Sequence, residues 1–368
     1  MVFIPFAKPC FFGNETKYVN DALESTWISD GKYIDLFEKE FSQILGASYG
    51  ISSSNGTTAL HLALLSHNIG PGDEVIVPDF SFITATNVTL YTGATPVFAD
   101  VDKDTWCIDP QSIANLVSDK TKAIIPVHTY GNVCEMEKIC RIAQKNDLIV
   151  VEDAAEALLS RYKKRYAGSM GDSGCFSFQS AKTITMGEGG IILTNDIRLD
   201  QKMRILRSHG MRPGKKYWHD AIGYNFRLTN IQAALGYSQL EHIEDIIAQR
   251  KRIYETYRKQ LINIKYVTMQ KFSKNVMPVV WAMAIKIDQL GTSKTRDDIM
   301  DELSEKGIET RPGFYPASKM PPYKNYRKDS VCHSESISSQ IVLLPTFLSL
   351  DDDTIKYICD NLEQVLEN

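Results

Sequence analysis

The sequence predicts an α/β fold in which a mostly parallel sheet is covered by helices on both sides. Between about residues 49 and 196, short runs rich in Val and Ile alternate with segments of helical apolar spacing. Continuous apolar runs of this kind are typical of strands that are buried on both faces. The alternation of strand and helix predicts parallel strands joined by helical crossovers.

The individual elements follow from the positions of the apolar residues. The predicted strands are short apolar runs at residues 74–78, 96–100, 123–128, 148–152, 175–178 and 190–194. The predicted helices between them carry apolar residues three or four positions apart, at residues 58–66, 135–145 and 199–206. Together they describe one sheet with helices packed against it.

The pattern changes after Asn225. A long helix without Gly or Pro beyond Gly236 is predicted for about residues 228–261. It is followed by a strand-like stretch, a helix and a Pro-rich turn region, at residues 279–287, 295–306 and 311–323. We therefore expect a large domain over residues 1–240 and a smaller α+β domain over residues 241–368.

Composition and charge exclude several classes of protein. The 368 residues, 43% of them hydrophobic, suffice for a sizeable core and roughly two domains. A net charge of −4 gives no reason to expect a nucleic-acid or membrane partner. The longest uncharged run, residues 80–99, contains several hydroxyl side chains and Pro96, so it predicts interior structure and not a membrane span.

Cysteine and histidine usage bears on the compartment and on metal binding. The seven cysteines are odd in number and lack CxxC spacing, so we expect reduced thiols and a cytoplasmic protein. Pro5, Lys8 and Pro9 interrupt the apolar start of the chain, which argues against a secretory signal. The histidines form no HExxH pattern, and no metal site is expected.

The first segment with polar residues of chemical interest is Ser52-Ser-Ser-Asn-Gly-Thr-Thr58. A strand-like stretch precedes it, and a helix is expected to begin at about Thr57. Free N–H groups at a helix N-terminus favour an anion, and a residue as small as Gly56 admits the anion to the backbone. A simple helix cap by Asn55 explains the same residues, and the segment alone leaves both interpretations open.

The second segment, Val150-Val-Glu-Asp-Ala-Ala-Glu156, places carboxylates at the end of a predicted buried strand. Open α/β sheets bind ligands at that end of their strands. Asp153 would suit a protonated heterocyclic nitrogen, the arrangement that lets pyridoxal phosphate accept electrons. For an isolated Asp in this position, a helix cap is the simpler explanation.

The third segment, Phe176-Ser-Phe-Gln-Ser-Ala-Lys182, is followed by the glycine-rich turn Gly187-Glu-Gly-Gly190. A lysine becomes a nucleophile where desolvation or a nearby cation keeps it neutral. A lone lysine is usually a solvated surface charge, and the apolar strand before Lys182 weakens that explanation without removing it. The order of an anion turn, an acid and then a lysine resembles the large domain of fold-type I pyridoxal-phosphate enzymes.

Further blocks extend this resemblance in order along nearly the whole chain. They are Thr26-Trp-Ile-Ser-Asp-Gly31, Asn55-Gly-Thr-Thr-Ala-Leu-His-Leu-Ala-Leu64, Gly70-Pro-Gly-Asp-Glu-Val-Ile-Val-Pro78, Tyr91-Thr-Gly-Ala-Thr-Pro-Val97, Pro126-Val-His-Thr-Tyr-Gly131, Glu152-Asp-Ala-Ala-Glu-Ala157, Lys182-Thr-Ile-Thr-Met-Gly-Glu-Gly-Gly190, Gly223-Tyr-Asn-Phe-Arg-Leu-Thr-Asn-Ile-Gln-Ala-Ala-Leu-Gly236 and Met320-Pro-Pro-Tyr323. With these blocks the chain resembles the DegT/DnrJ/EryC1/StrS family of sugar aminotransferases.

The resemblance implies which residues surround the cofactor ring. Lys182 would carry pyridoxal phosphate as a Schiff base, and Asp153 would pair with the ring nitrogen. Glu156 would lie near the O3′ side of the ring, where related enzymes often have Gln. Phe82 would stack on the ring.

The resemblance also implies how the phosphate is held and how the protein assembles. Gly56 and Thr57 would bind the phosphate through backbone N–H groups, and Ser177 would bind it with its hydroxyl. Asn225 would reach the phosphate of the neighbouring subunit. The active sites would then be shared between the two chains of a homodimer.

The implied reaction is ping-pong transamination. L-Glutamate would convert pyridoxal phosphate to pyridoxamine phosphate, and the amino group would pass to the ketone of a nucleotide-linked 4-keto-6-deoxy sugar. Lys182 would move the proton between substrate and cofactor. Amination of a 3-keto-6-deoxy sugar at C3 is the alternative. Less favoured are a sugar dehydratase, which has His in place of Lys182, and a non-catalytic regulatory relative.

Two departures from the most similar subgroup of the family concern the substrate. That subgroup tends to carry Phe-Gly-Asn immediately before the lysine, whereas this chain has Gln179-Ser-Ala181. It also tends to place histidines in the turn where this chain reads Arg311-Pro-Gly-Phe-Tyr-Pro-Ala-Ser-Lys319. We expect that turn at the sugar side, so Arg311 and Lys319 are candidate substrate contacts. Glu188, in the glycine-rich turn after Lys182, is a further candidate. The nucleotide (GDP, dTDP or UDP) and the aminated carbon stay open.

Overall fold

A computed structural model describes residues 3–288, 291–326 and 331–367, and its largest feature is a seven-stranded sheet. Its strands are β1 Tyr49–Ser53, β2 Glu74–Pro78, β3 Thr95–Ala99, β4 Thr121–Ile124, β5 Ile149–Asp153, β8 Ser173–Ser177 and β9 Gly190–Thr194. They follow the order β1-β9-β8-β5-β4-β2-β3. Neighbouring strands are parallel except at β9, which runs antiparallel to β1 and β8. The predicted mostly parallel, mixed sheet is confirmed.

Helices cover both faces of this sheet because its strands are apolar on both sides. In β2, Ile76 packs on one face while Val75 and Val77 pack on the other, as the two-residue period of a strand requires. The Ile76 face is covered by α2 Lys32–Leu45, α5 Pro110–Leu116, α6 Met136–Asn146 and α8 Asn230–Leu240. The opposite face is covered by α3 Gly56–Ser66, α4 Thr84–Tyr91 and α7 Ile197–Arg207.

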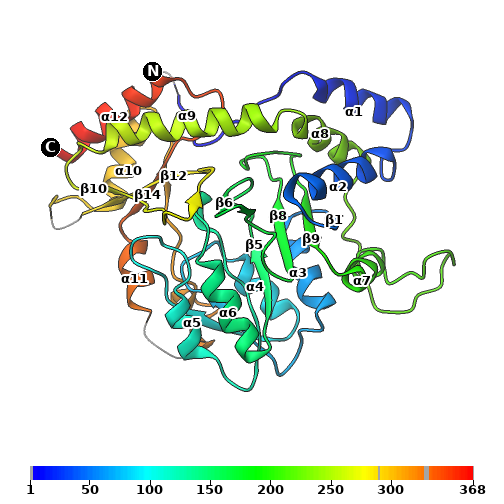
Figure 1. Cartoon of the computed structure of the whole chain (residues 1–368). Helices are drawn as coiled ribbons and strands as arrows, with labels where there is room; N and C mark the ends of the chain where they lie inside the picture. Colours follow the sequence, from blue (N-terminus) through cyan, green and yellow to red (C-terminus); the bar gives the residue numbers. More distant parts are fainter. Residues whose placement is uncertain (1–2, 289–290, 327–330, 368) are drawn as a thin grey trace.

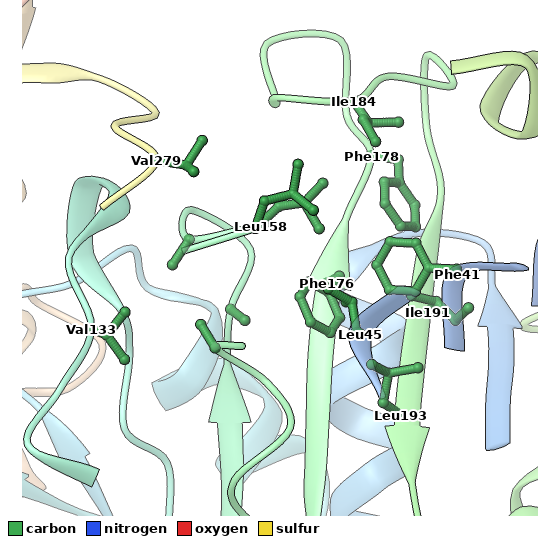
Figure 2. Packing of buried hydrophobic residues seen from close by; sticks show 14 of the residues in the cluster. Phe41, Leu45, Val133, Leu158, Phe176, Phe178, Ile184, Ile191, Leu193 and Val279 are labelled. Atoms are coloured by element: carbon green, nitrogen blue, oxygen red, sulfur yellow. The ribbon is translucent and has the colours of Figure 1, made fainter. Parts of the chain in front are cut away.

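Aromatic side chains fill the core between α2 and the strands β8 and β9. Figure 2 shows Phe41 beside Phe176 and Phe178. The ring centroids of Phe41 lie 5.1 and 5.4 Å from those of the other two, with nearly perpendicular planes. Each edge-to-face pair of this kind contributes about 0.5–1.5 kcal/mol beyond the burial of its surface. The packing fixes the end of β8, from which the chain enters the turn that carries Lys182.

A second sheet and a small third one use the remaining strands. The second has the order β10-β12-β14-β13, with β10 Val267–Met269, β12 Met283–Ile287, β13 Arg311–Pro312 and β14 Ile341–Leu344. It packs against α9 Ile243–Leu261, α10 Arg296–Glu305 and α12 Asp352–Glu367. The third joins β6 Arg161–Tyr162, β7 Arg165–Tyr166 and β11 Val276–Met277. In Figure 1, α9 crosses from α8 to the second sheet.

The remaining helices are α1 Asn14–Glu24, α11 Cys332–Ser338 and the 3-10 turns η1 Thr129–Gly131, η2 Ala317–Lys319 and η3 Lys324–Tyr326. None of the helices within the described ranges is both long and apolar enough to cross a bilayer.

The structure corrects three predicted elements. The predicted strands at residues 123–128 and 279–287 are shorter, since β4 ends at Ile124 and β12 begins at Met283. The predicted helix at 228–261 is divided between α8 and α9. Contacts with the N-terminal segment hold the break: Glu241 accepts hydrogen bonds from Asn14 and Tyr18, and Phe12 stacks on His242 at 4.5 Å. The local sequence carries no helix breaker there, so periodicity alone predicts one helix.

A buried ion network joins α2, β1 and α7. Glu38 is 6% exposed, and its carboxylate accepts hydrogen bonds from Arg204 and Arg207 at 2.8 and 2.7 Å. Ser52 donates to the same carboxylate from its N–H and hydroxyl at 2.8 and 2.7 Å. Burial opposes the charge, but the two guanidinium groups hold the pKa of Glu38 below its ordinary value.

Glu38→Gln is expected to lower the free energy of unfolding by about 2 kcal/mol, measured by urea denaturation. Loss of one charge of a buried pair typically costs about 3–5 kcal/mol, and here Arg204 keeps some contact with water, which reduces the cost. Glu255→Gln is the control, because its exposed pair with Arg258 is worth about 0.5 kcal/mol at most. Equal midpoints for the two variants would contradict the prediction.

Candidate active site

A cavity of about 770 Å³ opens at the carboxyl ends of the parallel strands. Asp153 is the last residue of β5, and Ser177 is the last residue of β8. This is the end at which open α/β sheets bind ligands. The residues predicted for the site that line the cavity are Gly56, Thr57, Phe82, Asp153, Glu156, Ser177, Lys182, Glu188 and Arg311.

The N-terminus of α3 forms one wall of the cavity. Asn55 caps this helix, since its side chain accepts a hydrogen bond from Thr58 N at 2.9 Å and Thr58 Oγ1 accepts one from Asn55 N at 3.1 Å. The cap uses the N–H of Thr58, and the N–H groups of Gly56 and Thr57 belong to the first turn, where a helix supplies no carbonyl partner. The helix cap and an anion site are therefore compatible.

The close approach of α3 to β8 requires glycine at position 56. A Cβ added to Gly56 would lie 2.7 Å from Ser177 Cβ, a distance that real Cβ atoms do not adopt. The glycine thus brings the first turn of α3 beside the Ser177 hydroxyl. This combination of N–H groups, a helix dipole and a hydroxyl fits a phosphate group.

Asp153 presents a buried carboxylate to the cavity. It is 5% exposed, and its Oδ1 accepts a hydrogen bond from Ala155 N at 3.1 Å. Burial raises the pKa of Asp153, although the Ala155 bond and the charge of Lys182 act against this rise. A cationic group in the cavity would stabilise the ionised carboxylate, so the position fits a protonated ring nitrogen.

Lys182 lies in the turn after β8 and faces a second buried acid. Its Nζ is 3.7 Å from Glu156 Oε1, and the Lys182 side chain is 15% exposed. Glu156 Oε2 accepts a hydrogen bond from Tyr130 N at 3.0 Å. Burial raises the pKa of Glu156, while the charge of Lys182 lowers it. The structure thus gathers one amine and two carboxylates around one cavity.

Phe82 exposes its ring to the cavity. The residue is 57% exposed, and its ring centroid lies 6.1 Å from that of Phe314. By contrast, Phe80, two positions earlier, is fully buried. An exposed aromatic face in a cavity is available to stack on a flat ligand.

The predicted substrate contacts are only partly brought together. Glu188 and Arg311 line the cavity, and the Arg311 guanidinium lies 4.3 Å from the Phe6 ring centroid. Lys319 lies outside the lining and pairs with Glu335 at 2.6 Å. Asn225 is also outside it, exposed, and accepts a hydrogen bond from Arg227 at 3.0 Å.

Sequence patterns give no role to Asp79, which anchors the turn at residues 311–319 through Ser318. It is fully buried at the end of β2, and its carboxylate accepts hydrogen bonds from Ser318 N at 2.7 Å and Ser318 Oγ at 3.1 Å. Burial raises its pKa to about 6, although the Ser318 bonds oppose this rise. Trp281 was likewise not predicted and lines the cavity beside Lys182. Both lie far along the chain from the residues that they contact, so no local pattern identifies them.

Asp79→Asn is expected to stabilise the protein by about 2–3 kcal/mol above pH 6, measured by urea denaturation. The raised pKa means that the folded chain binds this proton more tightly than the unfolded chain, so the contribution of Asp79 to wild-type stability falls as pH rises from about 4 to about 6. Asn has no charge and can still bond Ser318. The gain should disappear below pH 4, and an equal gain at all pH values would contradict the prediction.

A model of the DegT/DnrJ/EryC1/StrS aminotransferase family matches residues 9–363. The chain belongs to this family. It is 42% identical over 366 residues to the GDP-perosamine synthase of Escherichia coli O157:H7, covering 99% of each chain. It is also 42% identical to the GDP-perosamine synthase of Caulobacter vibrioides, covering 99% of this chain and 98% of that one. The predicted resemblance within the family, which is to GDP-perosamine synthases, is confirmed.

Solved structures agree with this membership. The Spr1654 protein of Streptococcus pneumoniae in its PLP-form superposes with a TM-score of 0.93 at 27% identity, covering 100% of this chain and 99% of that one. Its PMP-form superposes with a TM-score of 0.93. These findings confirm the predicted fold-type I class and the enzyme class, a pyridoxal-phosphate-dependent aminotransferase.

Proposed function

We propose that this chain moves an amino group from L-glutamate to the C4 keto group of a nucleotide-linked 4-keto-6-deoxy sugar. The product would serve the synthesis of amino sugars for O-antigen, capsule or other glycans. The observation that carries the proposal is the meeting of Lys182, Asp153 and the N-terminus of α3 around one cavity. Two relatives that share 42% of this sequence are named GDP-perosamine synthases, which supports the choice of substrate class.

We infer that pyridoxal 5′-phosphate is held by the residues that fit it. The N–H groups of Gly56 and Thr57 and the Ser177 hydroxyl would bind the phosphate, and the Phe82 face would stack on the ring. Glu156 would lie at the O3′ side of the ring. When bound, the cofactor supplies a carbonyl group that accepts the amino group and a ring that accepts the electron pair of the substrate carbon.

The residues around the cavity would manage charge and protons. The Asp153 carboxylate would keep a proton on the ring nitrogen, because a cationic partner stabilises the charge of a buried carboxylate. Lys182, as a free amine, would take the proton from the substrate carbon and would pass it to C4′ of the cofactor. Glu188 and Arg311 at the cavity wall, and Lys319 next to the lining residue Met320, are the candidate contacts of the nucleotide sugar.

We propose that the protein is a homodimer with shared active sites. Figure 1 shows the segment between α7 and α8 extending away from the body. That segment exposes Tyr217 (87%), Trp218 (49%) and Ile222 (92%), and apolar surface of this extent is typical of an interface. Asn225 lies at the base of the same segment, where Ser54 N donates a hydrogen bond to Phe226 O at 2.9 Å. From there it would reach the partner's phosphate.

We further propose a cytoplasmic location and the domain boundary near residue 240. The seven cysteines are free, which suits a reducing compartment. The break between α8 and α9 supports the boundary, because α8 packs on the large sheet and α9 packs on the second one from Ile253 onward, while Ile243 and Ile246 at its start still pack with the large sheet.

The deciding experiment incubates the enzyme and L-glutamate with a panel of nucleotide-linked 4-keto and 3-keto sugars that carry GDP, dTDP or UDP. The aminated product is identified by NMR. Amination of a 4-keto sugar is expected, and a product aminated at C3 would establish the alternative. Glutamate alone should bleach the visible absorbance of the bound cofactor. No bleaching with any amino donor would leave a dehydratase or a regulatory relative.

A further inference from the structure

The Lys182 side chain lies against an aromatic surface that the function proposed above does not use. Its Nζ is 4.1 Å from the centroid of the Trp281 ring. Trp281 is 8% exposed and the Lys182 side chain 15% exposed, so little water separates them. An ammonium group over an indole face is attracted by the ring, and more strongly where it is desolvated.

The same indole also holds the backbone of the lysine turn. Trp281 Nε1 donates a hydrogen bond to Ala181 O at 2.7 Å. That carbonyl belongs to the peptide bond that precedes Lys182. Within the turn, Lys182 N donates to Gln179 O at 2.8 Å. The Trp281 side chain therefore contacts both the peptide bond that precedes Lys182 and the amine at the end of the Lys182 side chain.

Trp281 is itself firmly placed. Its backbone N–H donates a hydrogen bond to Tyr130 O at 3.1 Å, and its backbone carbonyl accepts one from the buried Arg250 at 3.0 Å. Gly131 has φ +106°, and a Cβ there would lie 2.5 Å from Val279 O, so glycine allows the two segments to touch. Tyr130 N in turn binds Glu156. The acid and the indole that face the amine are thus parts of one network.

We propose that Trp281 is a positioning residue that provides the resting position of the Lys182 ammonium when this amine is not bonded to the cofactor. The inference rests on the function proposed above, because that function gives Lys182 a free state. In this position the amine lies between the Trp281 face and the Glu156 carboxylate, and Asp153 is the other titratable group that faces it. The indole holds the amine where it must act.

The test compares Trp281→Leu, which loses the aromatic face, with Trp281→Phe, which keeps a face and loses the N–H. Trp106→Phe is the control, because Trp106 is 1% exposed in the same hydrophobic cluster. The full chain, freed of cofactor, is acetylated briefly, and Lys182 labelling is measured by mass spectrometry relative to the exposed Lys122. This measurement does not depend on the reaction, so it separates failure of this inference from failure of the proposed function.

At pH 7, Trp281→Leu should raise Lys182 labelling about tenfold, Trp281→Phe less than about threefold, and Trp106→Phe not at all. In the loaded enzyme, Trp281→Leu should lower kcat about tenfold with little change in KM for glutamate, and Trp281→Phe should restore part of it. Wild-type labelling in Trp281→Leu, or an equal gain in Trp281→Leu and Trp281→Phe, would overturn the inference, since the latter reports only easier access.

Discussion

Lys182→Ala is expected to lower turnover by about 10⁴-fold or more. The variant removes the amine that would carry the cofactor and the base that would move the substrate proton, and general base catalysis alone is worth about 10²–10⁴-fold. No other lysine lines the cavity among the described residues, so none can replace it. The fold should remain, because the Lys182 side chain contributes little to the core and the variant loses only its contacts to Glu156 and Trp281.

Three measurements check this result. After borohydride reduction, mass spectrometry should find the cofactor mass on the Lys182 peptide of the wild-type chain and not on the variant. Thermal unfolding and the elution volume on gel filtration should stay unchanged. Lys122→Ala, at an exposed position of β4, should turn over like the wild type. A Lys182→Ala enzyme with wild-type turnover would show that another residue carries the cofactor.

The strands of the large sheet are predictable because their local sequence and their environment agree. The predicted runs at 74–78 and 190–194 coincide with β2 and β9. Both strands contact an apolar core on each face, so each one appears in the sequence as a continuous apolar run. Asp153 follows from the same rule, because it ends a buried strand at the edge where the cavity opens. Ser177 also ends a strand there, but only the family resemblance identified it.

What could not be predicted depends on contacts between distant parts of the chain. Asp79 is buried through Ser318, and Trp281 reaches Lys182 across almost a hundred residues, so neither leaves a local pattern. Lys182 itself shows the difference. Its sequence surroundings allow a solvated lysine, whereas the structure puts an acid and an indole on its amine. The family resemblance identified Lys182, because the blocks that carry it include the distant segments that meet around this amine.

Asp153→Asn is expected to lower turnover by about 10³-fold while the chain folds normally. The side chain keeps its size and its acceptor for Ala155 N, but it loses the negative charge that would hold a proton on the ring nitrogen. Losing one preorganised electrostatic contact to the reacting group costs about 10²–10³-fold, and here the charge acts within a buried site. The rate of the glutamate half-reaction, followed by stopped-flow absorbance, measures this effect directly.

The same substitution should make the cofactor-free chain slightly more stable, because burial raises the pKa of Asp153 and ionising it at pH 7 therefore costs free energy. A lower rate combined with higher stability is the signature of a residue kept for catalysis, since replacing a carboxylate kept for folding would lower stability and leave the rate unchanged. Asp172→Ala is the control: the Asp172 carboxylate accepts a hydrogen bond from Val150 N at 2.8 Å at the opposite end of β5, and Ala has no acceptor for it. That variant should lose stability and keep its rate. Wild-type turnover in Asp153→Asn would show that the ring nitrogen needs no acid at this position.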